Sequence, residues 1–378
     1  MKEMKVMPYS IRDLEITSEY PPVYCIPFET ARRHPDLAKR WYHPVCSRYN
    51  PRDGLLYIGN TAYNNDILYT FDPINKAFTS LNFWTVANKF DVKVHRSLEI
   101  DNDGIIFGAT ACLHDLDQQH EAHGGKLFSY NPDKGEIEVL GAPVPPWYIQ
   151  TITLDRKRRI IYGYVFQAPY LFRFDLDSRQ TQILAYTSVD GHNLTIDDDG
   201  NLWAFWRQMY GASSTLDAAP NTTLLKYNPD REELTWCHNL GIPGRSSSDY
   251  VHPDYVLNGG DGFIYMGTTS GMLFRFDPIA MKFDYLGTPM LEDSRIGGMT
   301  IGTDGLLYIA AGRNYRCRLI SYDRERSVFH NLGAISDPVT GSACCDTHFI
   351  TETSPGLFYI CETDNLKRSS YLWECDLR

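Results

Sequence analysis

The stretch KVHRSLEIDNDGIIFGATACLHDLDQQHEAHGGKLFSYNP, residues 93–132, contains one full copy of a pattern that recurs along the chain. An apolar run ends in a turn at Asp103-Gly104, a β-rich run follows from Ile105 to Ala109, and a later strand closes in Tyr130-Asn131-Pro132. Alternating apolar and β-branched residues bounded by Gly, Asp, Asn and Pro are the signals of strands and tight turns. The pattern therefore predicts an antiparallel meander of about four strands.

The same signals return along the whole chain. The glycine turn before the second strand recurs at Gly54, Gly104, Gly200, Gly262, Gly305 and Gly356, and one unit carries the charged turn 155–159 instead. The strand-closing motif recurs as Phe71-Asp72-Pro73, Tyr130-Asn131-Pro132, Phe174-Asp175-Leu176, Tyr227-Asn228-Pro229, Phe276-Asp277-Pro278, Tyr322-Asp323-Arg324 and, in a degenerate form, Trp373-Glu374-Cys375. Units spaced by roughly 40 to 60 residues are typical of propeller blades. Because one blade cannot bury both of its faces alone, we predict an all-β, seven-bladed β-propeller closed into a ring.

We expect a single domain over residues 1–378, in which the N-terminal segment 1–41 carries a strand that closes the ring. The chain stops at Arg378, just after the third strand of the seventh unit. A strand from the N-terminal segment can complete that blade and protect its open edge. The run Val23–Phe28, which precedes the first unit, is the predicted donor, and 31–42 is the one segment expected to be helical or irregular.

Composition and charge argue against two classes of partner. The net charge is -11 and the one basic run, Arg156–Arg159, is too short to form a stripe, so we expect no nucleic-acid partner. No apolar stretch approaches the roughly 18 residues of a membrane span, so we expect no membrane partner. The first ten residues lack the apolar region of a signal peptide, which predicts a cytoplasmic protein as written, or a secreted or periplasmic one if a signal was removed. The nine scattered cysteines favour buried hydrophobic side chains over a disulfide framework.

Two sets of loops are expected to converge on one face of the ring, near its axis. In a propeller, the inner strand of each blade begins on that face, and the loop between the second and third strands opens there. The first set contributes His95, Gln150, His192, Tyr255, Arg295 and His348. The second contributes Tyr63, residues 110–124, Tyr164, Arg207, Tyr210, Arg313, Tyr315 and Glu362. The sequence thus predicts a concave pocket lined by His, Tyr and Arg side chains.

The long loop 110–125 carries four side chains of chemical interest, Cys112, His114, His120 and His123. As nitrogen and sulfur ligands, these four could form a zinc site. Alternatively, His95 and one histidine of the loop could flank a substrate as general acid and base. A third interpretation is a polar surface loop with solvated histidines. A calcium loop needs more oxygen ligands at fixed positions than the turn aspartates supply.

Several repeated side chains are interpreted as structural. Aspartates such as Asp101, Asp103, Asp197, Asp198 and Asp199 cap turns. The aromatic residues at one equivalent strand position form the core between blades; they are Tyr57, Phe107, Tyr162, Trp203, Tyr265, Tyr308 and Tyr359. Arg173 and Arg275 hold equivalent third-strand positions, which favours a structural role. Arg207 and Arg295 do not recur at equivalent positions of other units, so repetition gives no reason to interpret them as structural. We expect both to face the pocket, where the forked donors of a guanidinium group suit a carboxylate. Tyr164 either packs in the core or faces the predicted pocket.

With these motifs, the chain resembles the seven-bladed propeller polysaccharide lyases, which include ulvan lyases and rhamnose–glucuronate lyases. The resemblance is carried by Lys-Val-His at 93–95, Asp-Gly-Ile-Ile-Phe-Gly-Ala-Thr at 103–110 and Gly-Gly-Lys-Leu-Phe-Ser-Tyr-Asn-Pro at 124–132. Asp346-Thr347-His348-Phe349 and Cys361-Glu362-Thr363-Asp364-Asn365 resemble the last blade of these enzymes. The resemblance spans nearly the whole ring.

The resemblance implies β-elimination at the uronic acid of an oligo- or polysaccharide. An Arg, His or amide group neutralises the C5 carboxylate, and Tyr or His groups remove the C5 proton and protonate the leaving oxygen. Matched by position, the resemblance gives catalytic roles to His95, to one of His114 and His123, and to Tyr164. It assigns the binding of the carboxylate to Arg173 or Arg207. His192 is a further catalytic candidate because it is expected to line the pocket. The substrate-binding candidates are Arg173, Arg295, Tyr210, Tyr255 and His348. Some relatives also bind a zinc or calcium ion.

Two other classes of function remain open. One is a metal-dependent propeller hydrolase or lactonase; such enzymes usually place Glu, Asn and Asp ligands on the inner strands, where this chain has His, Gln and Arg. The other is a non-catalytic interaction scaffold, since a fold does not imply a function. A scaffold would have no reason to gather His, Tyr and Arg on one face.

Overall fold

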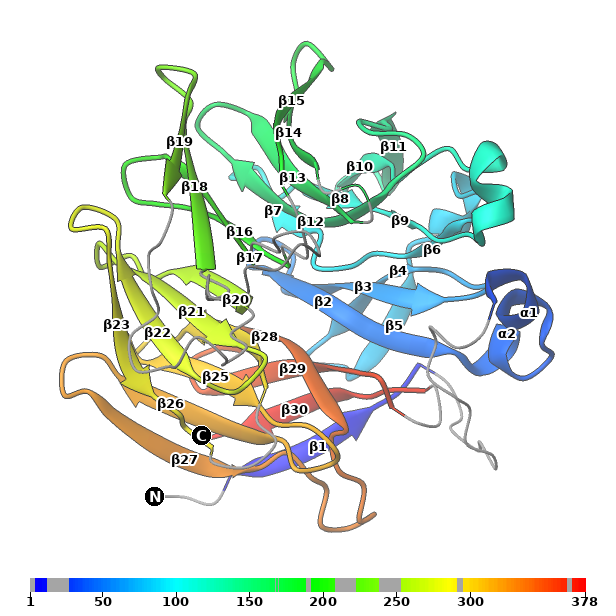
Figure 1. The fold of residues 1–378 in the computed structure, drawn as a ribbon. Coiled ribbons are helices and arrows are strands. Elements are labelled where there is room, and N and C mark those ends of the chain that lie inside the picture. The colour runs from blue at the N-terminus through cyan, green and yellow to red at the C-terminus, as the bar shows by residue number, and fades with distance from the viewer. Residues whose placement is uncertain are drawn as a thin grey trace, which may run out of the picture.

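The computed structural model describes residues 4–11, 27–166, 168, 170–187, 192–207, 222–237, 253–290, 295–365 and 369–378, with the backbone alone at 205–207 and 222–223. The strands form seven antiparallel sheets that follow one another around a central axis (Figure 1). Each innermost strand packs against the innermost strand of the next blade, so the ring is closed. The predicted seven-bladed β-propeller is confirmed.

Each blade is a four-stranded meander that runs outward from the axis. The first three blades are β2 (Tyr42–Asn50), β3 (Leu55–Ala62), β4 (Leu68–Asp72), β5 (Ala77–Ser80); β7 (Leu98–Ile100), β8 (Ile106–Ala109), β10 (Leu127–Asn131), β11 (Glu136–Gly141); and β12 (Tyr148–Asp155), β13 (Ile160–Phe166), β14 (Tyr170–Asp175), β15 (Thr181–Tyr186). The fourth and fifth are β16 (Leu194–Ile196), β17 (Leu202–Arg207), β18 (Thr222–Asn228), β19 (Glu233–Cys237); and β20 (Pro253–Asn258), β21 (Ile264–Thr268), β22 (Leu273–Asp277), β23 (Lys282–Gly287).

The last two blades are β24 (Ile296–Ile301), β25 (Leu307–Ala311), β26 (Arg318–Asp323), β27 (Val328–Ala334), and then β28 (Asp346–Ser354), β29 (Leu357–Thr363), β30 (Leu372–Asp376) with β1 (Lys5–Tyr9). Two short strands, β6 (Asp91–Lys93) and β9 (Ala111–Cys112), extend the first sheet. The remaining elements are helices α1 (Phe28–Arg33) and α2 (Leu37–Arg40) and the 3₁₀ helices η2 (Phe83–Thr85) and η3 (Leu116–Glu121).

The repeated turns form as the sequence predicts. The six turn glycines have φ between +75° and +84°, a region that side chains disfavour, and in the third blade Arg159 takes this place with φ +55°. The closing Asx residues accept two backbone hydrogen bonds each; Oδ1 of Asp277, for example, accepts from the N–H groups of Ile279 (2.9 Å) and Ala280 (2.8 Å). These side chains end each third strand by competing for the backbone donors of the turn.

The repeated aromatic residues lie in the core between blades, as expected. All seven are buried, and several bond an acidic side chain of their own blade: the Tyr57 hydroxyl donates to Asp53 (2.7 Å) and the Tyr308 hydroxyl to Asp304 (2.8 Å).

The eight described cysteines are all free and buried, which confirms their interpretation as small apolar side chains. Among the described residues, no helix is long and apolar enough to cross a bilayer.

An N-terminal strand closes the ring, but not the predicted one. Strand β1 pairs antiparallel with β30, with Val6 opposite Cys375, and Figure 1 shows the two ends of the chain side by side in this blade. In the predicted run Val23–Phe28, residues 23–26 lie outside the described part of the chain and Phe28 begins α1. The prediction was wrong in position because strand composition does not say which of several N-terminal segments reaches an edge that only the closed ring creates.

We expect the buried side of β1 to matter for stability. Val6 packs against the core of the last two blades, whereas its neighbour Met7 is 47% exposed. Val6→Lys should therefore lower the free energy of unfolding by about 2–4 kcal/mol, because it buries a charge at a sheet edge. Met7→Lys is the matched control and should change it by less than about 0.5 kcal/mol. Equal thermal unfolding temperatures for the two variants would show that β1 does not close the ring in solution.

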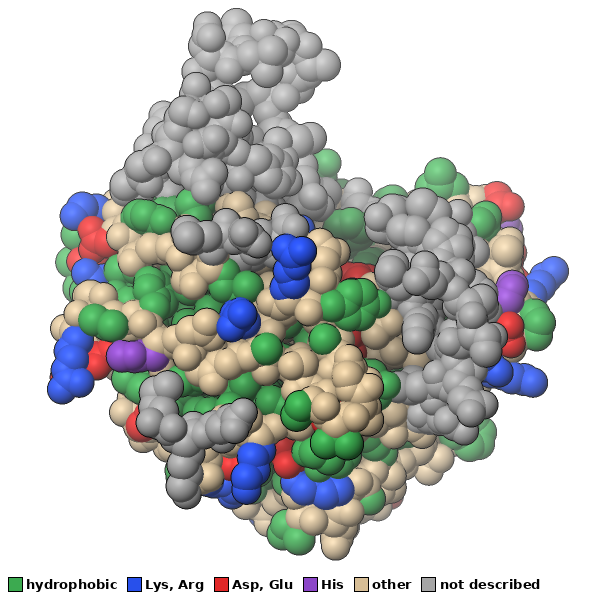
Figure 2. All heavy atoms as spheres, turned by 90° about the horizontal axis from the view of Figure 1, so that it is seen from below, with side chains coloured by type: hydrophobic (Ala, Val, Ile, Leu, Met, Phe, Trp, Pro, Cys, Tyr) green, Lys and Arg blue, Asp and Glu red, His purple; other side chains and the backbone are tan. Residues whose placement is uncertain are grey.

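The side of the ring seen in Figure 2 carries basic and acidic side chains interspersed among apolar and uncharged ones. No continuous basic stripe is visible among the described residues on that side. The buried histidines and ion pairs of the chain lie closer to the axis.

Candidate functional site

A β-bulge recurs at the same place in five of the innermost strands. The antiparallel register skips one residue in β2, β12, β20, β24 and β28, and the skipped residues are Val45, Gln150, Asp254, Gly297 and His348. A bulge leaves its residue outside the ladder and turns that side chain or carbonyl in a new direction. Gly297 shows how tight this region is, because a Cβ there would lie 1.9 Å from the carbonyl oxygen of Thr347.

The carbonyl groups at these bulges accept hydrogen bonds from side chains of other blades. Nδ1 of His95 bonds the Gln150 carbonyl (2.8 Å), and Nδ1 of His348 bonds the Val45 carbonyl (2.6 Å). Since a carbonyl oxygen can only accept, each Nδ1 carries the proton, and Nε2 of each neutral ring keeps its lone pair. The bulges thus select one tautomer of two buried histidines, whose ring centroids lie 4.8 Å apart.

An ion-pair network crosses the axis beside the two histidines. The Asp254 carboxylate is fully buried and accepts hydrogen bonds from Arg96 (Nη1, 3.1 Å) and Arg295 (Nη2, 3.1 Å, and Nε). Arg96 also donates to the bulge carbonyls of Asp254 and Gly297, and Arg295 donates to Asp346 (3.2 Å). Burial by itself raises the pKa of Asp254, but the two guanidinium groups outweigh it and hold this pKa below its usual range.

Burial and positive neighbours keep the two histidines neutral. Burial lowers the pKa of His95 well below its usual value, and the charges of Lys93 and Arg96 lower it further. Burial likewise lowers the pKa of His348, with Arg96 as the next cause. At neutral pH, both rings are therefore uncharged and present Nε2 as a hydrogen-bond acceptor or base.

A cavity of about 420 Å³ opens next to this cluster, between the first blade, the third blade and the loop 110–125. Its aromatic lining comes from α1, the first blade and the third blade, and consists of Phe28, Trp41, Tyr63, Tyr148 and Phe166. The Trp41 and Tyr63 rings meet edge to face with centroids 4.9 Å apart. Tyr148 connects the cavity to the axis, because its ring lies edge to face against His95 at 6.2 Å. Such a mixture of aromatic walls and a few polar groups is typical of small-molecule sites.

The polar groups of the cavity come from four segments, and they include Lys93, His43, His114, Asp115 and Asp364. Nδ1 of His114 bonds the Asp115 carbonyl (3.0 Å), so by the same argument as for His95 the neutral ring keeps its lone pair on Nε2. The Asp115 carboxylate accepts from the backbone N–H groups of Phe28 (2.7 Å) and Glu29 (3.2 Å) and ties the loop to the start of α1. The N-terminal helices therefore form a wall of the cavity.

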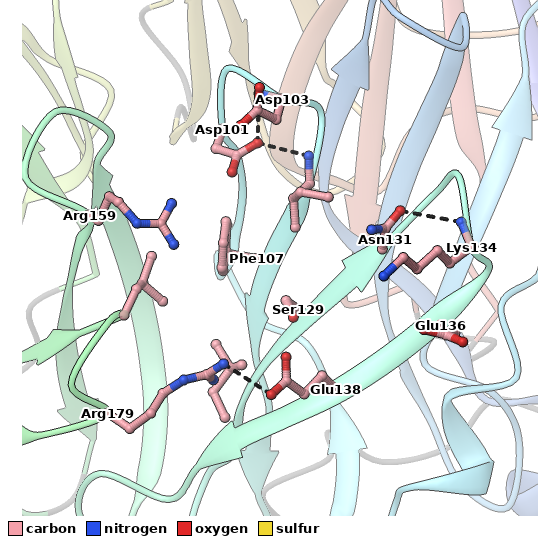
Figure 3. Close-up of a pocket in the computed structure, with 13 residues that line it drawn as sticks. Asp101, Asp103, Phe107, Ser129, Asn131, Lys134, Glu136, Glu138, Arg159 and Arg179 are labelled. Atoms are coloured by element: carbon pink, nitrogen blue, oxygen red, sulfur yellow. Dashed lines mark hydrogen bonds and ion pairs between the residues drawn. The ribbon is translucent and has the colours of Figure 1, made fainter.

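A second hollow lies on the outer side of the ring between the second and third blades, with a volume of about 370 Å³ (Figure 3). Its charged side chains are largely engaged: Arg179 pairs with Glu138 (3.0 Å), Arg159 pairs with Asp177 (2.8 Å), and Oδ1 of Asp101 accepts two turn N–H groups. This hollow is explained by the packing of two blades, and the turn aspartates there have the structural role expected of them.

Comparisons with known proteins were informative for the fold. No protein-family model matches the chain, and no curated protein sequence matches it. Among solved structures, the chain is similar to the extracellular domain of a proposed one-component system of B. thetaiotaomicron, with a TM-score of 0.61, 14% identity and coverage of 88% of this chain and 38% of the other. It is also similar to the extracellular domain of a hybrid two-component system of the same organism, with a TM-score of 0.58, 15% identity and coverage of 88% and 40%.

This chain thus spans about 40% or less of the length of these neighbours. At such low identity the likeness shows the propeller fold alone.

The structure brings together some of the residues selected from the sequence. His95, His348 and Arg295 belong to the axial cluster, His192 lies beside it with its ring 6.1 Å from that of His95, and the Tyr255 ring is covered by the Arg96 guanidinium at 5.5 Å. His114 and Cys112 line the cavity.

Other selected residues lie away from this site. Tyr164 is buried in the core between the third and fourth blades, where its hydroxyl bonds Thr187. Arg173 lies on an outer strand and contacts Tyr227 (3.2 Å) and Glu232 (3.3 Å), the structural role that its repeat favoured. His120 and His123 are exposed on the outside of the loop, near Glu121 and Asn88. Tyr210 and the side chain of Arg207 lie outside the described residues.

The proposed zinc ligands do not converge. Within the described residues, which include Cys112, His114, His120 and His123, no three His, Cys, Asp or Glu side chains lie together in the manner of a metal site. Burial raises the pKa of the Cys112 thiol to about 11, which disfavours the thiolate a zinc ion needs. The residues present therefore do not fit the zinc or calcium ion that the resemblance implied.

Sequence reasoning missed Lys93, Tyr148 and the aspartates that neutralise the axial arginines. Lys93 was part of the quoted Lys-Val-His motif, and that motif was the one signal that could have found it. Asp254 sits at a bulge, and a bulge has no signature in the sequence because the backbone groups that define it belong to the neighbouring strand.

Proposed function

We propose that the cavity binds a uronate-containing saccharide and that the protein cleaves it by β-elimination. The observation that carries this proposal is the set of groups on the cavity wall: an imidazole with a free Nε2 (His114), a phenol (Tyr148) and an ammonium group (Lys93). A base, a proton donor and a positive charge are the three groups that this reaction needs.

In the proposed reaction, Nε2 of His114 takes the C5 proton of the uronate. The C4–O bond then breaks, a double bond forms between C4 and C5, and the Tyr148 hydroxyl gives its proton to the leaving oxygen. Burial raises the pKa of Tyr148, so this hydroxyl remains protonated at neutral pH. The His95 ring packs edge to face against the Tyr148 ring.

Lys93 supplies the positive group on the cavity wall to which an anionic part of a ligand can bind. Burial lowers the pKa of His95, the charges of Lys93 and Arg96 lower it further, and a carboxylate bound at Lys93 would oppose these two charges. The aromatic walls suit the apolar faces of sugar rings. A non-catalytic, ligand-sensing role is the second candidate, because the structural neighbours are extracellular domains of one-component and hybrid two-component systems.

Ultraviolet absorbance distinguishes the two functions. The protein would be incubated with uronate polysaccharides and oligosaccharides, with and without a chelator, and absorbance followed in the band of unsaturated uronates. We expect a rise with at least one substrate, and the same rise with chelator. No rise with any substrate, from a folded protein that still binds one of them, would favour the sensing role.

A further inference from the structure

Lys93 differs from the other cationic side chains near the axis. Arg96 and Arg295 are paired with Asp254, Arg313 lies 3.7 Å from Asp346, and Lys126 pairs with Asp91 (2.6 Å). Among the described residues, by contrast, the Lys93 ammonium has neither a hydrogen bond nor an ion pair. It lines the cavity together with Tyr148 and His114.

The surroundings of Lys93 disfavour an unpaired ammonium group. Burial lowers the pKa of Lys93 to about 8, and Arg96 and Arg295 add to this effect. Asp364 on the cavity wall opposes it, but the two side chains are not within ion-pair distance. A partly buried charge without a partner destabilises a protein, and a bound anion would offset this cost.

We propose that Lys93 is the carboxylate-binding residue of the cavity and determines its preference for uronate over neutral saccharides. The choice of saccharide rests on the proposed function, whereas the binding of a carboxylate by Lys93 does not require catalysis. This assignment differs from the choice of Arg173 and Arg295 made from the sequence, since Arg295 already bonds two aspartates and Arg173 lies on an outer strand.

A carboxylate fits this site better than a phosphate. Lys93 supplies one positive charge, and the carboxylates of Asp115 and Asp364 on the same cavity wall would repel a dianion. The start of α1 offers no further anion site, because Asp115 already accepts its first two N–H groups.

Binding should weaken as the pH rises through about 8, where the ammonium loses its proton. The same cavity contains other titratable groups, namely His43, Tyr63, Cys112, His114, Asp115, Tyr148 and Asp364, and Cys46, His95, Arg96 and Arg295 lie behind it. The pH dependence must therefore be measured against a variant that lacks the Lys93 amine.

The experiment compares Lys93→Met and Lys93→Arg with the parent, all in a His114→Asn background that prevents turnover. The probes are glucuronate-, galacturonate- and iduronate-containing disaccharides and the same disaccharides with the carboxyl group reduced to an alcohol. Dissociation constants would be measured by calorimetry at pH 7 and pH 9.5. Methionine preserves the unbranched apolar stem of the side chain without its amine, and arginine preserves its charge.

At pH 7 the parent should bind at least one acidic disaccharide about 10- to 100-fold more tightly than its reduced form, the range expected for a hydrogen bond to a charged group. Lys93→Met should lose this preference without weakening the binding of the reduced form, Lys93→Arg should keep most of it, and the parent should lose it at pH 9.5. An undiminished preference in Lys93→Met, or binding of none of the disaccharides, would overturn the proposal.

The two proposals can fail separately. A carboxylate preference that depends on Lys93, in a protein that produces no ultraviolet-absorbing product, would support the binding role and remove the lyase. Product formation that persists in Lys93→Met with an unchanged preference for the acid would support the lyase and remove the role of Lys93.

Discussion

Replacing His114 with asparagine is expected to lower the rate of the proposed β-elimination by about 100- to 10,000-fold, the usual contribution of a general base. The asparagine amide can still donate to the Asp115 carbonyl, which His114 bonds at 3.0 Å, so the loop should keep its conformation. What the variant loses is the Nε2 lone pair of a ring that lines the cavity. The rate of product formation under saturating substrate measures this loss, and thermal unfolding checks that the fold is intact.

His123→Asn and His120→Asn are the matched controls. Both residues belong to the same loop and satisfy the same sequence pattern, but both are exposed on its outer side. Each variant should retain a rate within about threefold of the parent. If His123→Asn were the inactive variant and His114→Asn the active one, the assignment of the base to the cavity wall would be wrong.

Removal of the Asp254 carboxylate is expected to have the largest effect on stability. Asp254→Ala leaves the buried guanidinium groups of Arg96 and Arg295 without their shared partner, and breaking a buried ion pair from one side typically costs about 3–5 kcal/mol. Denaturant unfolding measures this difference. Asp254→Asn preserves the shape and removes only the charge, so it separates the loss of the ion pairs from the loss of packing.

An exposed turn aspartate serves as the control for Asp254. Asp261 accepts hydrogen bonds from the Tyr265 hydroxyl (2.9 Å) and Arg324 (2.8 Å), but it lies near solvent. Asp261→Ala should cost only about 1 kcal/mol. A similar loss in both variants would contradict the importance of the buried network.

The Asp254 network also predicts a pH dependence. The folded protein holds the pKa of Asp254 below its unfolded value of about 3.9, so the stabilisation is complete above that pH and declines as the pH falls below it. The difference in unfolding free energy between the parent and Asp254→Asn should therefore be constant from pH 5 to pH 7 and shrink in more acidic solution. A constant difference down to pH 2 would argue against an ionised Asp254.

The sequence alone was sufficient to predict the architecture of this protein. Turn glycines such as Gly104 and closing residues such as Asp277 act on backbone groups a few residues away, so their effect can be inferred from local order. Their repetition predicted the number of blades, and the propeller then predicted which loops meet near the axis. His95, His348, Arg295 and His114 were selected in this way.

The tertiary structure alone decided the chemistry of those loops. Whether His114 or His123 faces the cavity depends on the contact between Asp115 and α1, which are 86 or more residues apart in the chain. The tautomers of His95 and His348 depend on carbonyl groups at bulges in other blades. Lys93 has no ion pair among the described residues, whereas the buried Asp254 and Asp346 pair with Arg295. Burial and long-range pairing set these properties, and neither is encoded in the spacing of residues along the sequence.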